Sequence, residues 1–77
     1  MKKIVVTGGN GFIGGNLINF LNKKKYFVIN IDKNKYSKGS YLLKNLNKKY
    51  YKFYKLDINS KKIFHILKKY KPIAIFN

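Results

Sequence analysis

The chain has 77 residues, no cysteine, one histidine and two acidic residues, and its 18 lysines give a net charge of +16. This length allows one globular unit at most, with no disulfide to stabilise it. The histidine and the two aspartates are too few to build a zinc or calcium site. The apolar runs fall short of both a signal-peptide core and a membrane span. We therefore expect a cytoplasmic protein that does not enter a membrane.

The lysine excess has two explanations, nucleic-acid binding or a biased genome. Lysine, asparagine, isoleucine, tyrosine and phenylalanine, which are encoded by A- and T-rich codons, make up 51 of the 77 residues. Arginine, which makes the bidentate contacts to guanine and phosphate, is absent. We favour genome composition and expect no nucleic-acid partner. A lysine-rich nucleic-acid-binding module stays open as the alternative from another functional class.

The first half of the chain predicts a strand, a glycine turn, a helix and a second strand. Lys3–Thr7 is a continuous apolar, β-branched run, which is typical of a strand buried on both faces. A helix follows to about Lys24, with a predicted apolar stripe at Ile13, Leu17, Phe20 and Leu21. Residues 26–31 form a second apolar run that ends at Asp32.

The second half predicts a loop over residues 33–40, a short helix over 41–46 and a third strand over 50–56. Ser60 can then cap a helix whose apolar positions are Ile63, Leu67 and Tyr70. Pro72 ends this helix and leaves residues 73–76 as a fourth strand. Strands that alternate with helices indicate an α/β protein with right-handed crossovers and an open parallel sheet.

Five of the six glycines lie in TGGNGFIGG, residues 7–15, between the first strand and the first helix. In a Rossmann-type unit the pyrophosphate of a dinucleotide binds here, close to the N–H groups that begin the helix. The spacing fits G-x-G-x-x-G through Gly9, Gly11 and Gly14, or G-x-x-G-x-x-G through Gly8, Gly11 and Gly14. No Gly-Lys-Ser or Gly-Lys-Thr follows, which excludes a Walker loop. A merely flexible turn is the alternative.

Both acidic residues follow predicted strands at the same edge of the sheet. Asp32 lies 18 residues beyond Gly14, where a carboxylate accepts hydrogen bonds from the adenosine ribose and repels the extra phosphate of NADP. Lys33 and Lys35 keep NADP as an alternative cofactor, because a cation nearby can pair with its 2′-phosphate. Asp57 either accepts from the adenine amino group or caps the following helix.

The segments TGGNGFIGGNL, IDK, LDI and KPIAIFN make the chain similar to the extended short-chain dehydrogenase/reductases. Within them it resembles the NAD-dependent nucleotide-sugar epimerases and dehydratases, and most of all the dehydratases. The resemblance implies that Gly8, Gly11 and Gly14 form the three-glycine motif. It also implies that the backbone of Phe12 and Ile13 faces the pyrophosphate. The NAD contacts it implies are Gly8, Gly11, Phe12, Ile13, Gly14, Asp32, Lys33, Asp57 and Ile58.

The same resemblance implies a nucleotide-sugar substrate and an NAD-dependent lyase, in which the sugar gives up a hydride to the cofactor and later regains it. An epimerase or a decarboxylase of the family stays open. Residues 1–77 cover only the front of the family's coenzyme domain, so we expect a doubly wound Rossmann-type sheet truncated at its fourth strand. A catalytic Tyr-x-x-x-Lys helix, a substrate domain and a homodimer interface are expected beyond Asn77. The 77-residue piece alone is expected to be inactive.

Two apparent catalytic signals are set aside. Tyr51 and Lys55 have the Tyr-x-x-x-Lys spacing, but they fall on a predicted strand. There the spacing covers about 13 Å, against about 6 Å on a helix. His65 is expected to be an exposed surface residue. We therefore predict no catalytic residue within this stretch.

Overall fold

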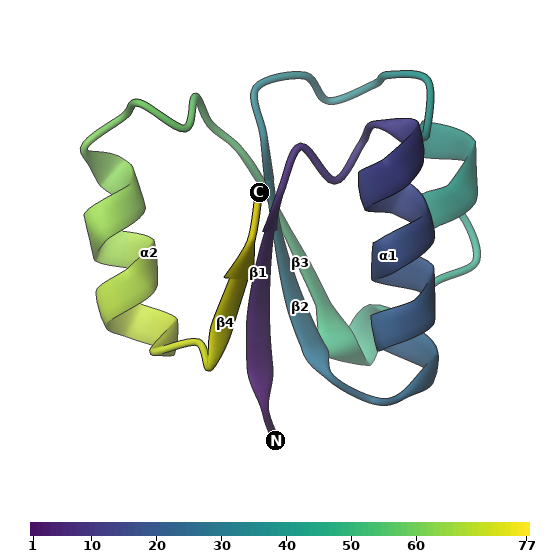
Figure 1. Cartoon of the computed structure of the whole chain (residues 1–77), viewed down its shortest axis with the longest axis horizontal. Coiled ribbons are helices and arrows are strands. Elements are labelled where there is room, and N and C mark those ends of the chain that lie inside the picture. The colour runs from purple at the N-terminus through teal and green to yellow at the C-terminus, as the bar shows by residue number, and fades with distance from the viewer.

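Four parallel strands lie in the order β3-β2-β1-β4, with one α-helix on each face of the sheet (Figure 1). The computed structural model describes all 77 residues. Its elements are β1 (Lys3–Thr7), α1 (Phe12–Lys23), β2 (Phe27–Asp32), η1 (Ser40–Leu43), η2 (Lys48–Tyr50), β3 (Tyr51–Lys55), α2 (Lys62–Tyr70) and β4 (Ala74–Phe76). The chain adds β2 and β3 on one side of β1, and then crosses through α2 to place β4 on the other. This reversal confirms the predicted doubly wound α/β sheet and puts its switch point at the carboxyl ends of β1 and β4.

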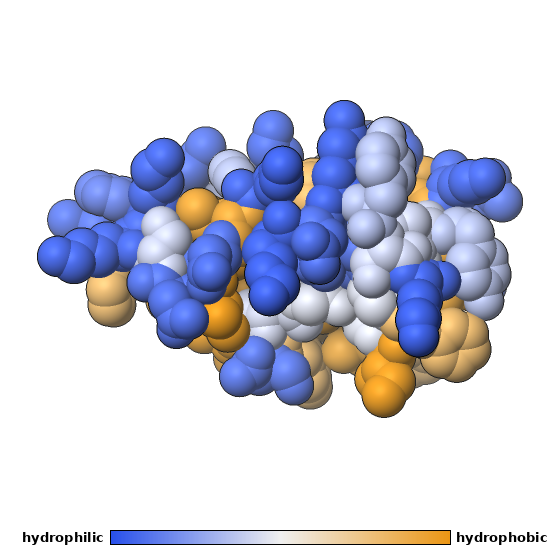
Figure 2. Space-filling view, turned by 90° about the horizontal axis from the view of Figure 1, so that it is seen from above, coloured by the Kyte–Doolittle hydropathy of each residue, from blue (hydrophilic) through white to orange (hydrophobic).

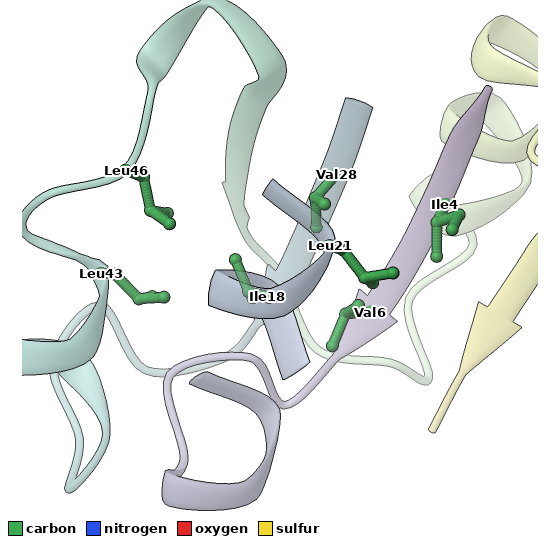
Figure 3. Packing of buried hydrophobic residues seen from close by; sticks show 7 residues of the cluster. All are labelled: Ile4, Val6, Ile18, Leu21, Val28, Leu43 and Leu46. Atoms are coloured by element: carbon green, nitrogen blue, oxygen red, sulfur yellow. The ribbon is translucent and has the colours of Figure 1, made fainter. Parts of the chain in front are cut away.

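Apolar side chains of β1 alternate between two cores, one on each face of the sheet. Ile4 and Val6 lie under α1, whereas Val5 faces α2. The residues of the α1 core point toward one another in Figure 3: Ile4, Val6, Ile18, Leu21, Val28, Leu43 and Leu46. The α2 core contains Val5, Ile29, Ile31 and Ile66. Burial on both faces explains why these strands read as continuous apolar runs.

The buried face of α1 is shifted by one residue from the predicted stripe. Ile13 and Phe20 are 85% and 58% exposed, whereas Ile18 and Leu21 are buried. The buried residues of α1 are Gly15, Ile18, Leu21 and Asn22, so of the predicted stripe only Leu21 is buried, and Leu17 is half-buried against the core. The turn before the helix fixes this rotation, because Gly14 packs directly on the backbone of Gly8 and Gly9, just after β1.

The predicted short helix over residues 41–46 is wrong in type and extent. The structure instead has two short 3₁₀ helices, η1 and η2, and residues 44–47 lie between them. Asn47 accounts for the start of η2, because its side chain accepts a hydrogen bond from the backbone N–H of Lys49 at 3.1 Å. Leu43 and Leu46 still reach the α1 core.

α2 begins two residues after the serine that was predicted to cap it. The hydroxyl of Ser60 accepts a hydrogen bond from the backbone N–H of Lys62 at 3.2 Å. Ile66 is buried, and around it pack the predicted apolar residues Ile63, Leu67 and Tyr70. Lys71 is in the left-handed region at φ 48°, and Pro72 follows, so the helix ends as predicted. No helix of the protein has both the length and the apolar character needed to cross a membrane.

Candidate functional site

The turn between β1 and α1 is closed by contacts that only glycine allows. Gly8 has φ +68°, a conformation that residues with a Cβ rarely adopt. A Cβ on Gly14 would lie 2.5 Å from the carbonyl oxygen of Gly8, and one on Gly9 would lie 2.1 Å from Oδ1 of Asn30. Gly8, Gly9 and Gly14 thus each occupy a position where a side chain would be strained or crowded, so the structure gives a reason for glycine in both of the predicted spacings.

The start of α1 presents unpaired backbone donors. The N–H groups of Phe12, Ile13 and Gly14 make no hydrogen bond within the chain, and Gly11 before them has no side chain to cap the helix. A Cβ on Gly11 would meet only the Gly8 carbonyl oxygen, at 3.3 Å, so folding itself leaves room for one. Free N–H groups at a helix N-terminus suit a phosphate, and a bare Gly11 lets it approach.

Asp32 is held at the carboxyl end of β2 by two backbone hydrogen bonds. Its Oδ2 accepts from the N–H of Asn10 at 3.0 Å, and its Oδ1 accepts from the N–H of Asn34 at 2.9 Å. Because each carboxylate oxygen has more than one lone pair, both can still accept from a ligand. The carboxylate is thus fixed beside the glycine turn and remains able to bind hydroxyl groups.

Two hollows along the carboxyl edge of the sheet bring most of the predicted site residues together. The larger is about 430 Å³ and is lined by Thr7, Gly8, Ile31, Asp32, Lys33, Leu56, Asp57, Ile58, Asn59 and Asn77. The smaller, about 250 Å³, shares three of these residues and adds Ile13 and Gly14. Figure 2 looks down on this edge, where hydrophilic residues cover much of the surface. Gly11 and Phe12 lie outside both linings.

The second acid and the two lysines take distinct positions. Asp57 accepts from the backbone N–H of Asn59 at 2.8 Å, within a local turn. It does not cap α2, which begins at Lys62, so the capping interpretation is wrong. Lys33 lines the same hollow as Asp32, whereas the ammonium of Lys35 lies over the ring of Tyr36, 5.6 Å from its centre.

The two residues with the Tyr-x-x-x-Lys spacing are separated on a strand, and Tyr51 has a structural role. Tyr51 and Lys55 lie at opposite ends of strand β3, as predicted. The hydroxyl of Tyr51 accepts a hydrogen bond from Nδ2 of Asn30 at 3.0 Å. Burial raises the pKa of Tyr51; the bond from Asn30 opposes this rise, and the charge of Asp32 adds to it. His65 is exposed on α2, as predicted.

Sequence reasoning missed Asn10, the residue between the second and third glycines. Asn10 is only 3% exposed, and both its side chain and its backbone are bonded to residues around Asp32. An asparagine between glycines resembles an ordinary turn residue. Its partners are twenty or more positions away, so no local pattern predicts this role.

Known proteins match the chain over nearly its whole length. A family model described as GDP-mannose 4,6 dehydratase matches residues 5–77. A dTDP-glucose 4,6-dehydratase of Haemophilus influenzae is 41% identical over 80 residues, which cover 100% of this chain and 24% of the relative.

Two solved structures show the same fold. A dTDP-glucose 4,6-dehydratase from Bacillus anthracis, in complex with NAD, matches with a TM-score of 0.83 and 32% identity over 97% of this chain and 25% of its own. A UDP-glucose 4-epimerase from Thermotoga maritima, with UDP-glucose, matches with a TM-score of 0.76 and 31% identity over 95% of this chain and 22% of its own. The chain thus spans about a quarter of the length of these relatives.

Proposed function

Because this chain belongs to the family described as GDP-mannose 4,6 dehydratase, we propose that the carboxyl edge of its sheet binds NAD. The observation that carries the proposal is the fixed carboxylate of Asp32 beside a glycine turn with three unpaired N–H groups. The relative from Bacillus anthracis, whose structure contains NAD, supports the choice of cofactor.

Each part of the site then has a partner on the cofactor. The N–H groups of Phe12, Ile13 and Gly14 bind the pyrophosphate, which approaches over Gly8 and Gly11. The carboxylate of Asp32 accepts from both hydroxyls of the adenosine ribose, with Lys33 beside it. Farther along the larger hollow, Asp57 accepts from the adenine amino group, and Ile58 packs against the ring.

We propose that these residues form the front of the coenzyme domain of a longer protein, a dTDP-glucose 4,6-dehydratase. NAD, when bound, accepts a hydride from the sugar and returns it. The present residues bind and orient the cofactor, and the catalytic and sugar-binding groups lie beyond Asn77. A 4-epimerase of the family would have a coenzyme domain that begins with the same fold, and the similarity to the UDP-glucose 4-epimerase supports this alternative. The complete protein would be a cytoplasmic homodimer that acts on a nucleotide sugar.

Titration of NAD and NADP against wild type and Asp32→Ala tests the cofactor assignment. Loss of charge-assisted bonds to the ribose should weaken NAD binding about tenfold to a hundredfold. Rejection of NADP should relax, because the repelling charge is gone. Asp57→Ala is the matched control: it removes the other acid and should leave the NAD to NADP ratio unchanged. A wild type that prefers NADP, or an Asp32→Ala variant with unchanged NAD affinity, contradicts the assignment.

Two further measurements address the rival functions. Gly11→Ala should weaken NAD binding by roughly tenfold or more, because the added methyl group holds the phosphate away from the N–H groups. If the protein is instead a nucleic-acid-binding module, Gly11→Ala should bind polyanions as well as the wild type does and should lose no other function. Incubation of the natural protein with dTDP-glucose and UDP-glucose separates the two enzyme activities, since a 4-keto-6-deoxy product identifies the dehydratase and a 4-epimer identifies the epimerase.

A further inference from the structure

Every polar group of Asn10 is bonded to the segment that carries Asp32. Its backbone N–H donates to Asp32, and its carbonyl oxygen accepts from the N–H of Gly39 at 2.8 Å. Its side-chain Oδ1 accepts from Nδ2 of Asn30 at 2.9 Å. Its Nδ2 donates to two carbonyl oxygens, those of Asn34 and Lys35. One residue of the glycine turn thus holds the chain both before and after the acid.

This set of bonds is anchored in the interior of the molecule. Asn30 is 0% exposed and lies on β2, two residues before Asp32. Besides bonding Asn10, its Nδ2 donates to the hydroxyl of Tyr51 on β3. Asn34 and Lys35, by contrast, belong to an exposed loop with no regular structure. Asn10 therefore ties the exposed loop after Asp32 to the buried part of the sheet through one buried amide.

We propose that Asn10 is a positioning residue for cofactor selection. It sets the distance of the Asp32 carboxylate from the phosphate turn, so that a bound pyrophosphate places the ribose hydroxyls on the carboxylate, where a 2′-phosphate would be repelled by its charge. The proposal rests on the proposed function, because it assigns Asn10 a role toward the adenosine ribose of NAD. Asn10 itself does not touch the ribose; it acts through Asp32 and the loop behind it.

An amide is the side chain that fits all three partners. Two carbonyl oxygens require a donor, and the N–H group of Asn30 requires an acceptor, which asparagine supplies within one short side chain. Alanine supplies neither. Aspartate keeps the acceptor for Asn30 but turns an oxygen toward the carbonyls of Asn34 and Lys35. Both substitutions should free the loop while leaving the carboxylate of Asp32 chemically intact.

The test measures how much the 2′-hydroxyl of the cofactor contributes to binding, with and without Asn10. Dissociation constants for NAD, 2′-deoxy-NAD and NADP are determined for the natural full-length protein and for Asn10→Ala. In wild type, loss of the 2′-hydroxyl should weaken binding about tenfold, as expected for a hydrogen bond to a charged group. In Asn10→Ala the same loss should cost about threefold or less, and the preference for NAD over NADP should narrow to a similar degree.

Asn22→Ala provides the matched control. Asn22 is also a buried asparagine of the α1 side, and both atoms of its amide are bonded to the backbone of Asn47, which does not line the cofactor hollows. This variant loses a comparable set of side-chain bonds and should keep the wild-type ratios. Ratios of dissociation constants do not depend on the folded fraction. Asn10→Asp, which keeps the size of the side chain, gives the same comparison if Asn10→Ala does not fold.

Each outcome has a distinct meaning. If Asn10→Ala and Asn10→Asp weaken all three cofactors equally, so that the ratios stay at wild-type values, Asn10 is purely structural and the inference is overturned. If the ratios collapse in Asn22→Ala as well, the effect is general loosening, which also overturns it. If the wild type itself is indifferent to the 2′-hydroxyl, the ribose role of Asp32 fails, and the proposed function fails with it.

Discussion

Gly39 lies directly against Gly11, so that a Cβ on Gly39 would be 2.0 Å from the carbonyl oxygen of Gly11. The two residues belong to different loops, one after β2 and one before α1. Their contact is reinforced by the hydrogen bond from the N–H of Gly39 to the carbonyl oxygen of Asn10. The loop that follows Asp32 is therefore seated on the glycine turn as part of the same structure.

Gly39→Ala should destabilise the protein by about 1–3 kcal/mol, because the methyl group overlaps backbone atoms that have no room to move away. Gly11→Ala is the control on the other side of the same contact. Its added Cβ meets one atom at 3.3 Å, so its effect on stability should be well below that of Gly39→Ala. Urea-induced unfolding measures both changes. Equal stabilities for the two variants would show that the loop does not pack on the turn.

Ile18→Ala should lower the free energy of unfolding by about 2–5 kcal/mol, the usual cost of a cavity in a packed core. Ile18 is 0% exposed between α1 and the sheet. Ile13→Ala, on the same helix, should change stability by no more than about 0.5 kcal/mol, because that side chain is 85% exposed. The two variants also show which face of α1 is buried, because the predicted stripe placed Ile13 in the core and the structure places Ile18 there. A reversed order of the two effects would restore the predicted stripe.

The stability contributed by Tyr54 should be lost at alkaline pH. Its hydroxyl lies 2.6 Å from that of Tyr70; burial raises the pKa of Tyr54, and the bond to Tyr70 raises it further. The folded protein thus holds the phenol proton more tightly than the unfolded chain, whose tyrosines ionise near pH 10. The contribution is complete below about pH 10 and falls as pH rises through the folded-state pKa.

Chemical denaturation of wild type and Tyr54→Phe across this range measures the effect. The stability difference between the two proteins should shrink as pH rises above about 10, because only the wild type has the Tyr54 phenol to ionise. Deprotonation of lysines remote from Tyr54 affects both proteins alike and cancels in the comparison, whereas Lys52 and Lys69 lower the pKa of Tyr54 and belong to the measured effect. Tyr41→Phe, at a position that is 57% exposed, serves as the control and should show a constant difference. A constant difference for Tyr54→Phe too would show that folding does not raise the pKa of the Tyr54 phenol.

Local sequence predicted the features that depend on near neighbours. The apolar runs marked the strands to within one residue at each end, and the glycine cluster marked the turn between β1 and α1, because both patterns follow from short-range geometry. The rotation of α1 depends on how Gly14 meets the end of β1 in space, which a helical period leaves undetermined. The role of Asn10 depends on bonds to residues such as Asn30, which only the folded sheet brings close.

The central place of β1 gives the molecule an order of assembly during synthesis on the ribosome. Val5 pairs with Ile29 of β2 on one side and with Ile75 of β4 on the other. The buried residues of the α1 core all precede Asn47, so this face can close before α2 has left the ribosome. The opposite face waits for Ile66, and until then Val5 and Ile29 lie open to chaperones and to other nascent chains.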